Sequence, residues 1–172
     1  ISLREGITST CDWFVKNNTP KEKLIVTGTP KMDDINIIPS HKIESLTDNM
    51  SILVILNPIG EDLCRAFLKI VKEAICRSNI KYKLSIKLHP SSRSYKDLPK
   101  EIFQEMEFKI FHLDEIHSLI KNNDAVISTP STAGAEVIAC YKPLLTMNFK
   151  EIKYTLAYEG HDCNIKFHDA ES

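Results

Sequence analysis

The chain has 172 residues, of which 42% are hydrophobic and 26% charged, with 22 basic against 23 acidic side chains. That length fits one domain better than two small ones, and burial of roughly 70% of the extended surface lets it fold without disulfides or metal. The formal net charge of −1 excludes a general attraction to nucleic acid, which needs an excess of Lys and Arg. The longest apolar run, Ile52–Leu56, is far shorter than the ~20 residues of a membrane-spanning helix.

The five cysteines form no CxxC pair, and their number is odd. This pattern favours small buried side chains in a reducing compartment over a thiolate nucleophile or a metal site. The histidines show neither HxxxH nor HExxH spacing, so no metal site is expected. No basic-then-apolar leader opens the chain, and we expect a cytoplasmic protein without a transmembrane segment.

The first 50 residues predict few regular elements. Ser2–Glu5 is a capping box for a helix that ends before Pro20. Leu24–Val26 predicts a short strand that leads into Thr27–Pro30. Residues 31–50 are polar, with scattered Pro, Asp and Asn, and indicate a connector with little regular structure.

From Ser51 onward, short apolar runs alternate with amphipathic stretches. Ile52–Leu56 is typical of a strand that is buried on both faces of a parallel sheet. Helix 61–77 follows, with acids in its first turn and Arg77 at its end, as the helix dipole favours. The later predicted elements are strand Leu84–Leu88, a helix from Pro99 carrying Ile102, Phe103 and Met106, strand Phe108–Phe111, a helix capped by Asp114, strand Ala125–Ile127, helix 132–141, strand Leu144–Phe149 and a sixth strand, Asn164–Phe167.

This alternation predicts an α/β fold. Right-handed strand–helix–strand crossovers build a Rossmann-like three-layer αβα domain with a mostly parallel sheet of five or six strands. Such sheets bind ligands beyond the carboxyl ends of their strands, where the strand order reverses. Three predicted strands end in small or polar loops, namely Asn57–Glu61, His89–Arg93 and Ser128–Glu136. The sequence therefore places a candidate binding site among these loops.

Ser128–Glu136 has the composition of an anion-binding helix start. Ser131 or Thr132 is expected to cap the helix, whose first backbone N–H groups then favour a phosphate. Ser128 adds a further hydroxyl, and the carboxylate of Glu136 could accept both hydroxyls of a ribose. An ordinary Ser/Thr cap with a solvated Glu136 explains the same residues.

His89 ends a predicted strand, and Pro90 fixes the direction in which the chain leaves it. A histidine at this place can donate to a diphosphate oxygen, although a lone histidine at the end of a strand is more often a structural hydrogen-bond partner. Lys87, two residues earlier, is expected to extend its ammonium into solvent. The chain contains no GxGxxG, GxxxxGK[ST] or GxSxG motif, so it has no sequence support for dinucleotide, P-loop or serine-hydrolase chemistry.

Four segments, taken in order, resemble the C-terminal, nucleotide-binding half of GT-B-type glycosyltransferases of the surface-polysaccharide type and the related non-hydrolysing UDP-GlcNAc 2-epimerases. Val26–Asp33 resembles the VTGxPxxD segment of the inter-domain crossover, and Ile52–Gly60 is similar to the first strand and loop of the second Rossmann domain. Lys87–Pro90 resembles the HP motif, and Ser128–Glu136 resembles the serine-rich loop with its acidic helix residue. The resemblance covers nearly the whole chain.

The resemblance implies a set of residues that bind the donor nucleotide. His89 would contact its phosphate, the loop hydroxyls and helix amides would bind the same group, and Glu136 would hold the ribose. Asn57 and Gly60 would line the cleft, with Thr29 on the hinge side. The implied set is His89, Ser128, Ser131, Thr132, Glu136, Asn57, Gly60 and Thr29.

The resemblance also implies an architecture of two Rossmann domains. Residues 1–30 would be a helix and strand from the end of a preceding domain or crossover, 31–50 a connector, and 51–172 the nucleotide-binding domain. The general base would lie in the missing N-terminal domain, so this chain alone is expected not to catalyse. No DxD motif is present, which fits transfer without a metal or another cofactor.

The implied activity is transfer of a sugar from a UDP- or CMP-linked donor to a glycan or lipid-linked acceptor. Peripheral membrane association through the full-length protein is left open. The STPST sequence departs from the Ser-Gly-Gly loop of the epimerases, which favours a transferase. The alternatives are a non-hydrolysing UDP-GlcNAc 2-epimerase, a CDP-glycerol-type phosphotransferase, and a non-catalytic Rossmann-like interaction domain.

Overall fold

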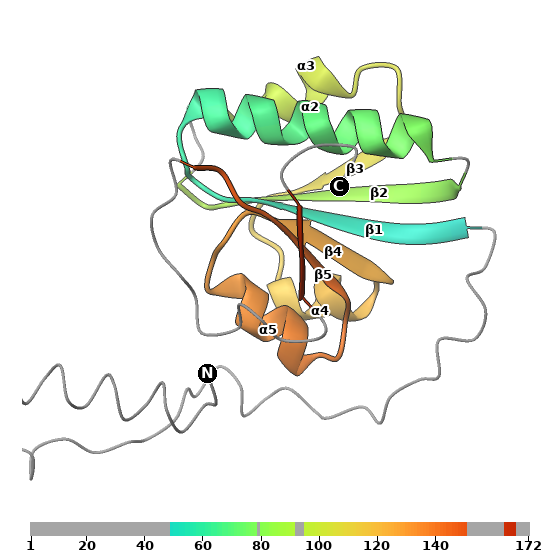
Figure 1. Ribbon diagram of the computed structural model, residues 1–172, viewed down its shortest axis with the longest axis vertical. Coiled ribbons are helices and arrows are strands. Elements are labelled where there is room, and N and C mark those ends of the chain that lie inside the picture. The colour runs from blue at the N-terminus through green and yellow to red at the C-terminus, as the bar shows by residue number, and fades with distance from the viewer. Residues whose placement is uncertain (1–48, 79, 92–94, 151–163, 168–172) are drawn as a thin grey trace, which may run out of the picture.

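The computed structural model describes residues 49–78, 80–91, 95–150 and 164–167. Within them, parallel strands form one sheet in the order β3-β2-β1-β4-β5-β6 (Figure 1). From β1, the strands β2 and β3 are added toward one edge of the sheet, and β4, β5 and β6 are added toward the other edge. The strand order therefore reverses between β1 and β4. The predicted α/β, Rossmann-like fold with a parallel sheet is confirmed.

The central strand is β1 (Asn49–Leu56), and its last four residues are buried. It pairs with β2 (Lys81–Leu88) over its whole length and with β4 (Ala125–Ser128) over its second half. The remaining strands are β3 (Phe108–Phe111), β5 (Leu144–Met147) and β6 (Asn164–Phe167). β1 and β2 begin three residues earlier than the apolar runs predict, because ladder pairing continues into the mixed, mostly polar residues before them.

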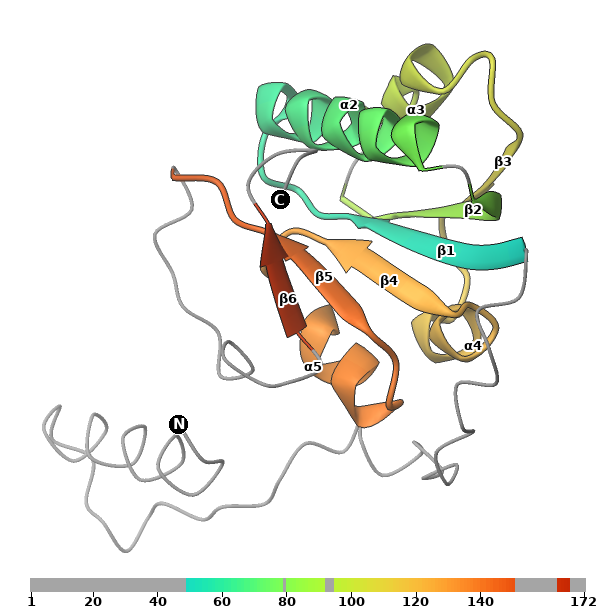
Figure 2. The same cartoon turned by 45° about the vertical axis from the view of Figure 1, so that its right-hand side comes forward.

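Helices cover both faces of the sheet (Figures 1 and 2). α2 (Glu61–Arg77) and α3 (Leu98–Ile102) lie on one face. α4 (Ile116–Lys121) and α5 (Ala133–Ala139) lie on the other. The described residues therefore form the expected three layers.

The continuous apolar run of β1 is explained by the two cores that it serves. Val54 and Leu56 pack with the buried side chains of α2 and α3. Leu53 and Ile55 point to the other face and pack with buried residues of α4 and α5. Because successive side chains of a strand alternate between faces, only a strand covered on both sides needs apolar residues at every position.

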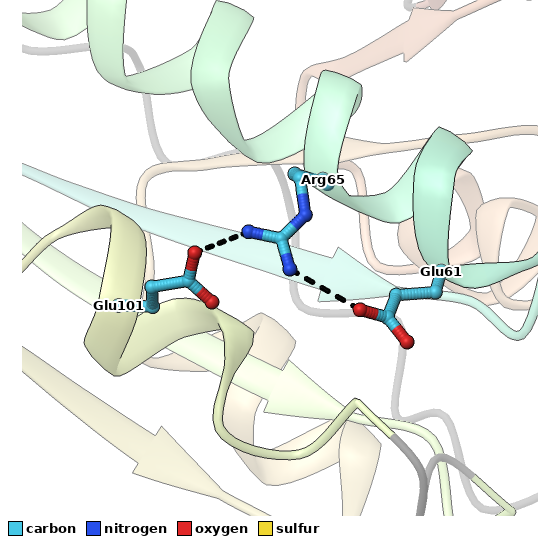
Figure 3. A network of polar contacts seen from close by, with 3 residues as sticks. All are labelled: Glu61, Arg65 and Glu101. Carbon is cyan, nitrogen blue, oxygen red and sulfur yellow. Dashed lines mark hydrogen bonds and ion pairs between the residues drawn. The ribbon is translucent and has the colours of Figure 1, made fainter.

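An ion-pair network joins the first turn of α2 to α3 (Figure 3). Arg65 Nη2 lies 3.1 Å from Glu61 Oε1 on the same helix, and the other terminal nitrogen of Arg65 contacts Glu101 of α3. Both carboxylates are exposed and Arg65 is partly exposed, so the network adds little stability.

Several predicted helix limits are corrected. Asp114 does not cap α4: Glu115 occupies the N-cap position, and Asp114 Oδ2 accepts a hydrogen bond from the backbone N–H of His112 (3.2 Å). α3 ends at Ile102, and Met106 follows in a turn outside the helix. The α5 helix and the β5 strand are also shorter than the predicted ranges 132–141 and 144–149.

The cysteine prediction holds at one of the described positions. Cys64 of α2 is fully buried, and its Sγ lies 3.2 Å from the backbone oxygen of Asn57. Burial raises the pKa of this thiol, as expected for a side chain that serves packing. Cys140 is half-buried, whereas Cys76 is exposed and departs from the expectation of a buried side chain.

The predicted helix and strand of residues 1–30 and the connector of 31–50 lie outside the described residues, except for Asn49 and Met50, which belong to β1. Thr29 and the segment Val26–Asp33 lie outside them as well. The proposed domain limits therefore stay predictions.

Candidate functional site at the carboxyl edge of the sheet

The switch point of the sheet lies between β1 and β4, and polar loops leave both strands there. Asn57 follows β1, and Ser128 ends β4. Since the strands are parallel, their carboxyl ends meet at one edge, where open α/β sheets bind ligands. His89 follows the neighbouring strand β2 and reaches the same edge.

The strand register arranges these residues in rows. Ile55 pairs with Lys87 on one side and with Ser128 on the other. Continued by one more pair beyond Leu56 and Leu88, the register sets Asn57 beside His89, and the His89 N–H donates to the Leu56 carbonyl (3.2 Å). Ser128 pairs with Ile55, two residues before Asn57. With strands about 4.8 Å apart and a rise of about 3.3 Å per residue, the backbones of His89 and Ser128 are separated by roughly 12 Å.

Asn57 binds the β4 loop directly. Its Nδ2 donates to Ser128 Oγ (3.0 Å), Thr129 Oγ1 (2.9 Å) and the Thr129 carbonyl (3.1 Å). Ser128 Oγ in turn donates to the Thr129 carbonyl (2.8 Å). Asn57 is 7% exposed, and Ser128 and Thr129 are 1% exposed. This cluster, Asn57–Ser128–Thr129, is a buried clamp that fixes the two loops of the switch point against each other.

Gly60 begins α2 in a conformation that glycine adopts readily. Its φ is 97° and its ψ 150°, a region essentially closed to residues with a Cβ. A Cβ at this position would meet no atom within 4 Å, so the backbone faces open space. Glu61 and Asp62 directly follow and place two carboxylates at this helix end. An anion is therefore disfavoured at the start of α2, although the dipole alone would attract one.

His89 is exposed, and its ring is oriented by Ser91. The backbone N–H of Ser91 donates to His89 Nδ1 (3.2 Å), and Ser91 Oγ lies 2.7 Å from the same nitrogen. A neutral ring that accepts at Nδ1 carries its proton on Nε2. Nε2 is then a donor at the carboxyl edge, the form that can bind a phosphate oxygen.

The start of α5 differs from the prediction in one respect. Thr132 occupies the N-cap position and is exposed, but within the described residues its side chain makes no capping hydrogen bond. The turn is closed by the backbone instead, since Gly134 N donates to Ser131 O and Ala135 N to Thr132 O (both 3.1 Å). The Thr132 hydroxyl is thus directed to no helix amide.

Glu136 is buried between helices and does not face solvent. It is 7% exposed, and its Oε2 lies 2.9 Å from Nε2 of His117 on α4. The other ring nitrogen of His117 lies 3.7 Å from Glu115 Oε1. His117 also lines a surface depression of about 250 Å³ with Glu115, Ser118, Lys121 and Asn122. This pair could not be predicted from the sequence, because residue spacing does not show that α4 and α5 are neighbours.

Lys87 is buried, which corrects the expectation that its ammonium reaches solvent. It is 7% exposed, and its Nζ donates to the carbonyls of Leu88 (3.0 Å) and His112 (2.7 Å). Burial lowers the pKa of Lys87, and the negative charge of Asp114 partly opposes this. The protein thus holds a buried cation two residues before His89, near the end of β2.

The structure therefore brings part of the predicted site together. Asn57 and Ser128 bind each other, and His89 lies in the same row as Asn57. Gly60 and Thr132 are exposed at the starts of the two helices that follow β1 and β4. Over the described residues, no group of three metal-ligating side chains is found, and no helix is long and apolar enough to cross a membrane.

Comparisons with known proteins give a likeness in fold. No protein-family profile and no curated protein matches the chain. Among solved structures, it is similar to E. coli heptosyltransferase WaaC with ADP-2-deoxy-2-fluoro heptose, at 11% identity and a TM-score of 0.49, over 69% of this chain and 36% of that one. It is also similar to a chain of the tetrameric eIF2B-β2-δ2 complex from C. thermophilum, at 17% identity and a TM-score of 0.38, over 58% and 36%. The chain spans about a third of the length of these structures.

Proposed function

We propose that this chain is the donor-binding half of a nucleotide-sugar-dependent glycosyltransferase that builds a surface polysaccharide or another glycan. The observation that carries the proposal is His89, an exposed ring with Nε2 available as a donor, beside the Asn57–Ser128–Thr129 clamp at the switch point. A strand-order reversal is where α/β sheets of this kind bind nucleotides. The motif resemblance of Lys87–Pro90 and Ser128–Glu136 supports the same assignment.

In the proposed reaction, an acceptor hydroxyl attacks the anomeric carbon of the donor sugar. The bond between that carbon and the phosphate oxygen breaks, the new glycosidic bond forms, and the acceptor proton passes to a general base in another domain. The nucleotide phosphate leaves with additional negative charge, which oriented donors stabilise. His89 Nε2 and the exposed Thr132 hydroxyl are the groups of this chain that would provide them.

Calorimetric titration of the chain with UDP, CMP and CDP tests the proposal. At least one nucleotide is expected to bind, and His89→Ala is expected to weaken it by ~1.5–3 kcal/mol if the ring bonds a charged phosphate. His112→Ala is the matched control, because His112 is also an exposed histidine at the carboxyl end of a strand, one strand farther from the switch point. Absence of binding in a folded sample, or equal affinity of His89→Ala, would remove the assignment.

A non-catalytic interaction domain with the same fold is the second candidate. The observation that favours it is that three residues of the implied ligand set already have partners inside the protein: Asn57 and Ser128 bind each other, and Glu136 contacts His117. The two candidates differ in the titration, since a scaffold binds none of the three nucleotides. Product analysis with the full-length protein and UDP- or CMP-sugars would then separate a transferase from an epimerase or a CDP-glycerol-type phosphotransferase.

A further inference from the structure

Lys87 is a buried cation close to the proposed phosphate site. Its strand partner Ile55 belongs to the core under α4 and α5, so Lys87 lies on that face of the sheet. The β1–β2 ladder continues to His89, and alternation along a strand puts residues 87 and 89 on the same side. Two residues of strand span about 7 Å. The ammonium therefore lies beneath the row of His89 and Asn57.

The ammonium has hydrogen-bond partners but no carboxylate at ion-pair distance. Nζ donates to two carbonyls, those of Leu88 and His112. Across the described residues, the ion pairs within 4.0 Å include none of Lys87. Asp114 is the acidic residue that acts on Lys87, and its carboxylate is exposed and accepts from the His112 N–H. Solvent screens that interaction, so most of the buried charge remains uncompensated.

A buried charge without a counter-ion is costly in free energy. In proteins such a group is usually paired with an opposite charge, or its pKa shifts so that it becomes neutral. The lowered pKa of Lys87 expresses this cost. An apolar residue at this position would pack against Ile55 and the α4 layer without the cost of a buried charge. The position thus fits a side chain whose charge becomes useful when an anion binds.

We propose that the phosphate of a nucleotide bound at His89 is the counter-ion of Lys87. This inference rests on the proposed function and deepens it, because it assigns part of the affinity for the nucleotide to Lys87, a residue whose side chain is buried. Lys87 acts on the phosphate through its electric field at short range, while His89 supplies the hydrogen bond. The contribution of Lys87 to the binding free energy must therefore grow with the negative charge of the ligand.

A purely structural role of Lys87 makes a different prediction. The ammonium ties the end of β2 to the loop after β3 through the His112 carbonyl. If that is its whole role, its loss weakens all ligands equally, whether they are charged or neutral. Comparing CDP, CMP and cytidine separates the two roles, since CDP carries more negative charge than CMP, and cytidine carries none.

The experiment compares Lys87→Met, Lys87→Arg and the control Lys83→Met by calorimetric titration at low ionic strength. Lys83 is exposed, lies on the same strand and face, and is four residues from Lys87, about 13 Å farther from the carboxyl edge. Lys87→Met is expected to weaken CDP by about tenfold, CMP by less and cytidine not at all. Lys87→Arg should retain most of the CDP affinity, and Lys83→Met should change none.

Equal loss for all three ligands, or no loss, overturns the inference and leaves the proposed function standing. If the folded wild-type chain binds no nucleotide, the proposed function fails, and inorganic pyrophosphate decides the inference. Thermal stabilisation by pyrophosphate that is lost in Lys87→Met then supports a Lys87 anion site, and its absence overturns it.

A measurement on the wild type covers the case in which Lys87→Met does not fold. The ¹³Cε resonance of Lys87 is followed during titration with CDP and with cytidine. A shift with CDP that cytidine does not produce supports the inference. An unchanged resonance at saturating CDP, or the same shift with cytidine, overturns it.

Discussion

His117 Nε2 and Glu136 Oε2 lie 2.9 Å apart across the interface between α4 and α5. The two side chains are only 15% and 10% exposed, so this is a largely buried polar pair from helices that follow different strands. Removal of one partner from such a pair leaves a buried group without compensation. The pair therefore fixes α5 relative to α4, and with it the Ser131–Thr132 turn that precedes α5.

We expect His117→Ala to lower the free energy of unfolding by ~2–4 kcal/mol, because the carboxylate of Glu136 stays buried without its partner. The double variant His117→Leu/Glu136→Leu should lose less than the single variant, since it removes the charge together with the partner. Urea denaturation at pH 7 measures both. Glu115→Gln is the control: Glu115 is 74% exposed and 3.7 Å from the ring, and less than about 0.5 kcal/mol is expected. A loss of similar size for His117→Ala and Glu115→Gln would contradict a buried pair.

The Asn57–Ser128–Thr129 clamp leads to a prediction on stability. Asn57→Ala removes the donor of three buried acceptor contacts, and we expect a loss of ~2–3 kcal/mol in the free energy of unfolding. Asn122→Ala, at an exposed position after α4, should change it by less than about 0.5 kcal/mol. Urea denaturation is again the measurement. Equal, small losses for both variants would show that the clamp does not join the loops.

The sheet could be predicted from the sequence because its signals are local. Phe108–Phe111 and Asn164–Phe167 are strands with the predicted limits, and the acids in the first turn and the arginine at the end of helix 61–77 mark that helix correctly. The edge that carries the loops then follows from general rules for parallel sheets. The location of the candidate site could be predicted for the same reason.

The details of the site depend on contacts between distant segments. The sequence predicts the Lys87 ammonium in solvent, because its sequence neighbours do not show that the His112 carbonyl, in the loop between β3 and α4, lies close enough to accept from it. Glu136 has a suitable place in sequence for a ribose ligand, yet the structure sets it against His117. Asp114 has the composition of a cap, but its carboxylate binds the backbone before it. Each difference arises from tertiary packing that no local pattern contains.

Gly60 provides a test of backbone strain without a steric contribution. Its φ of 97° disfavours any side chain, while a Cβ would meet no atom within 4 Å. We expect Gly60→Ala to cost ~1–3 kcal/mol in the free energy of unfolding through strain alone. Thermal and urea denaturation check this value. A loss below about 0.5 kcal/mol would mean that the turn before α2 adopts another conformation.

The last prediction concerns the pH dependence of stability that Lys87 causes. Burial lowers the pKa of Lys87 below its ordinary value of 10.5, so between the lowered pKa and 10.5 the unfolded chain binds more protons than the folded one. The free energy of unfolding contributed by this group therefore rises with pH across that window, as the cost of a buried charge disappears. Below the lowered pKa, both states hold the proton and the contribution no longer changes.

The difference in unfolding free energy between wild type and Lys87→Met isolates this effect from the other groups that titrate at alkaline pH. We expect wild type to gain on the variant as pH increases toward 10.5, and the difference to be constant near neutral pH. Urea denaturation in a series of buffers measures it, with Lys83→Met as the control whose difference from wild type stays flat, because Lys83 is exposed. A difference for Lys87→Met that is equally flat, or that falls with pH, would contradict a buried ammonium beneath His89.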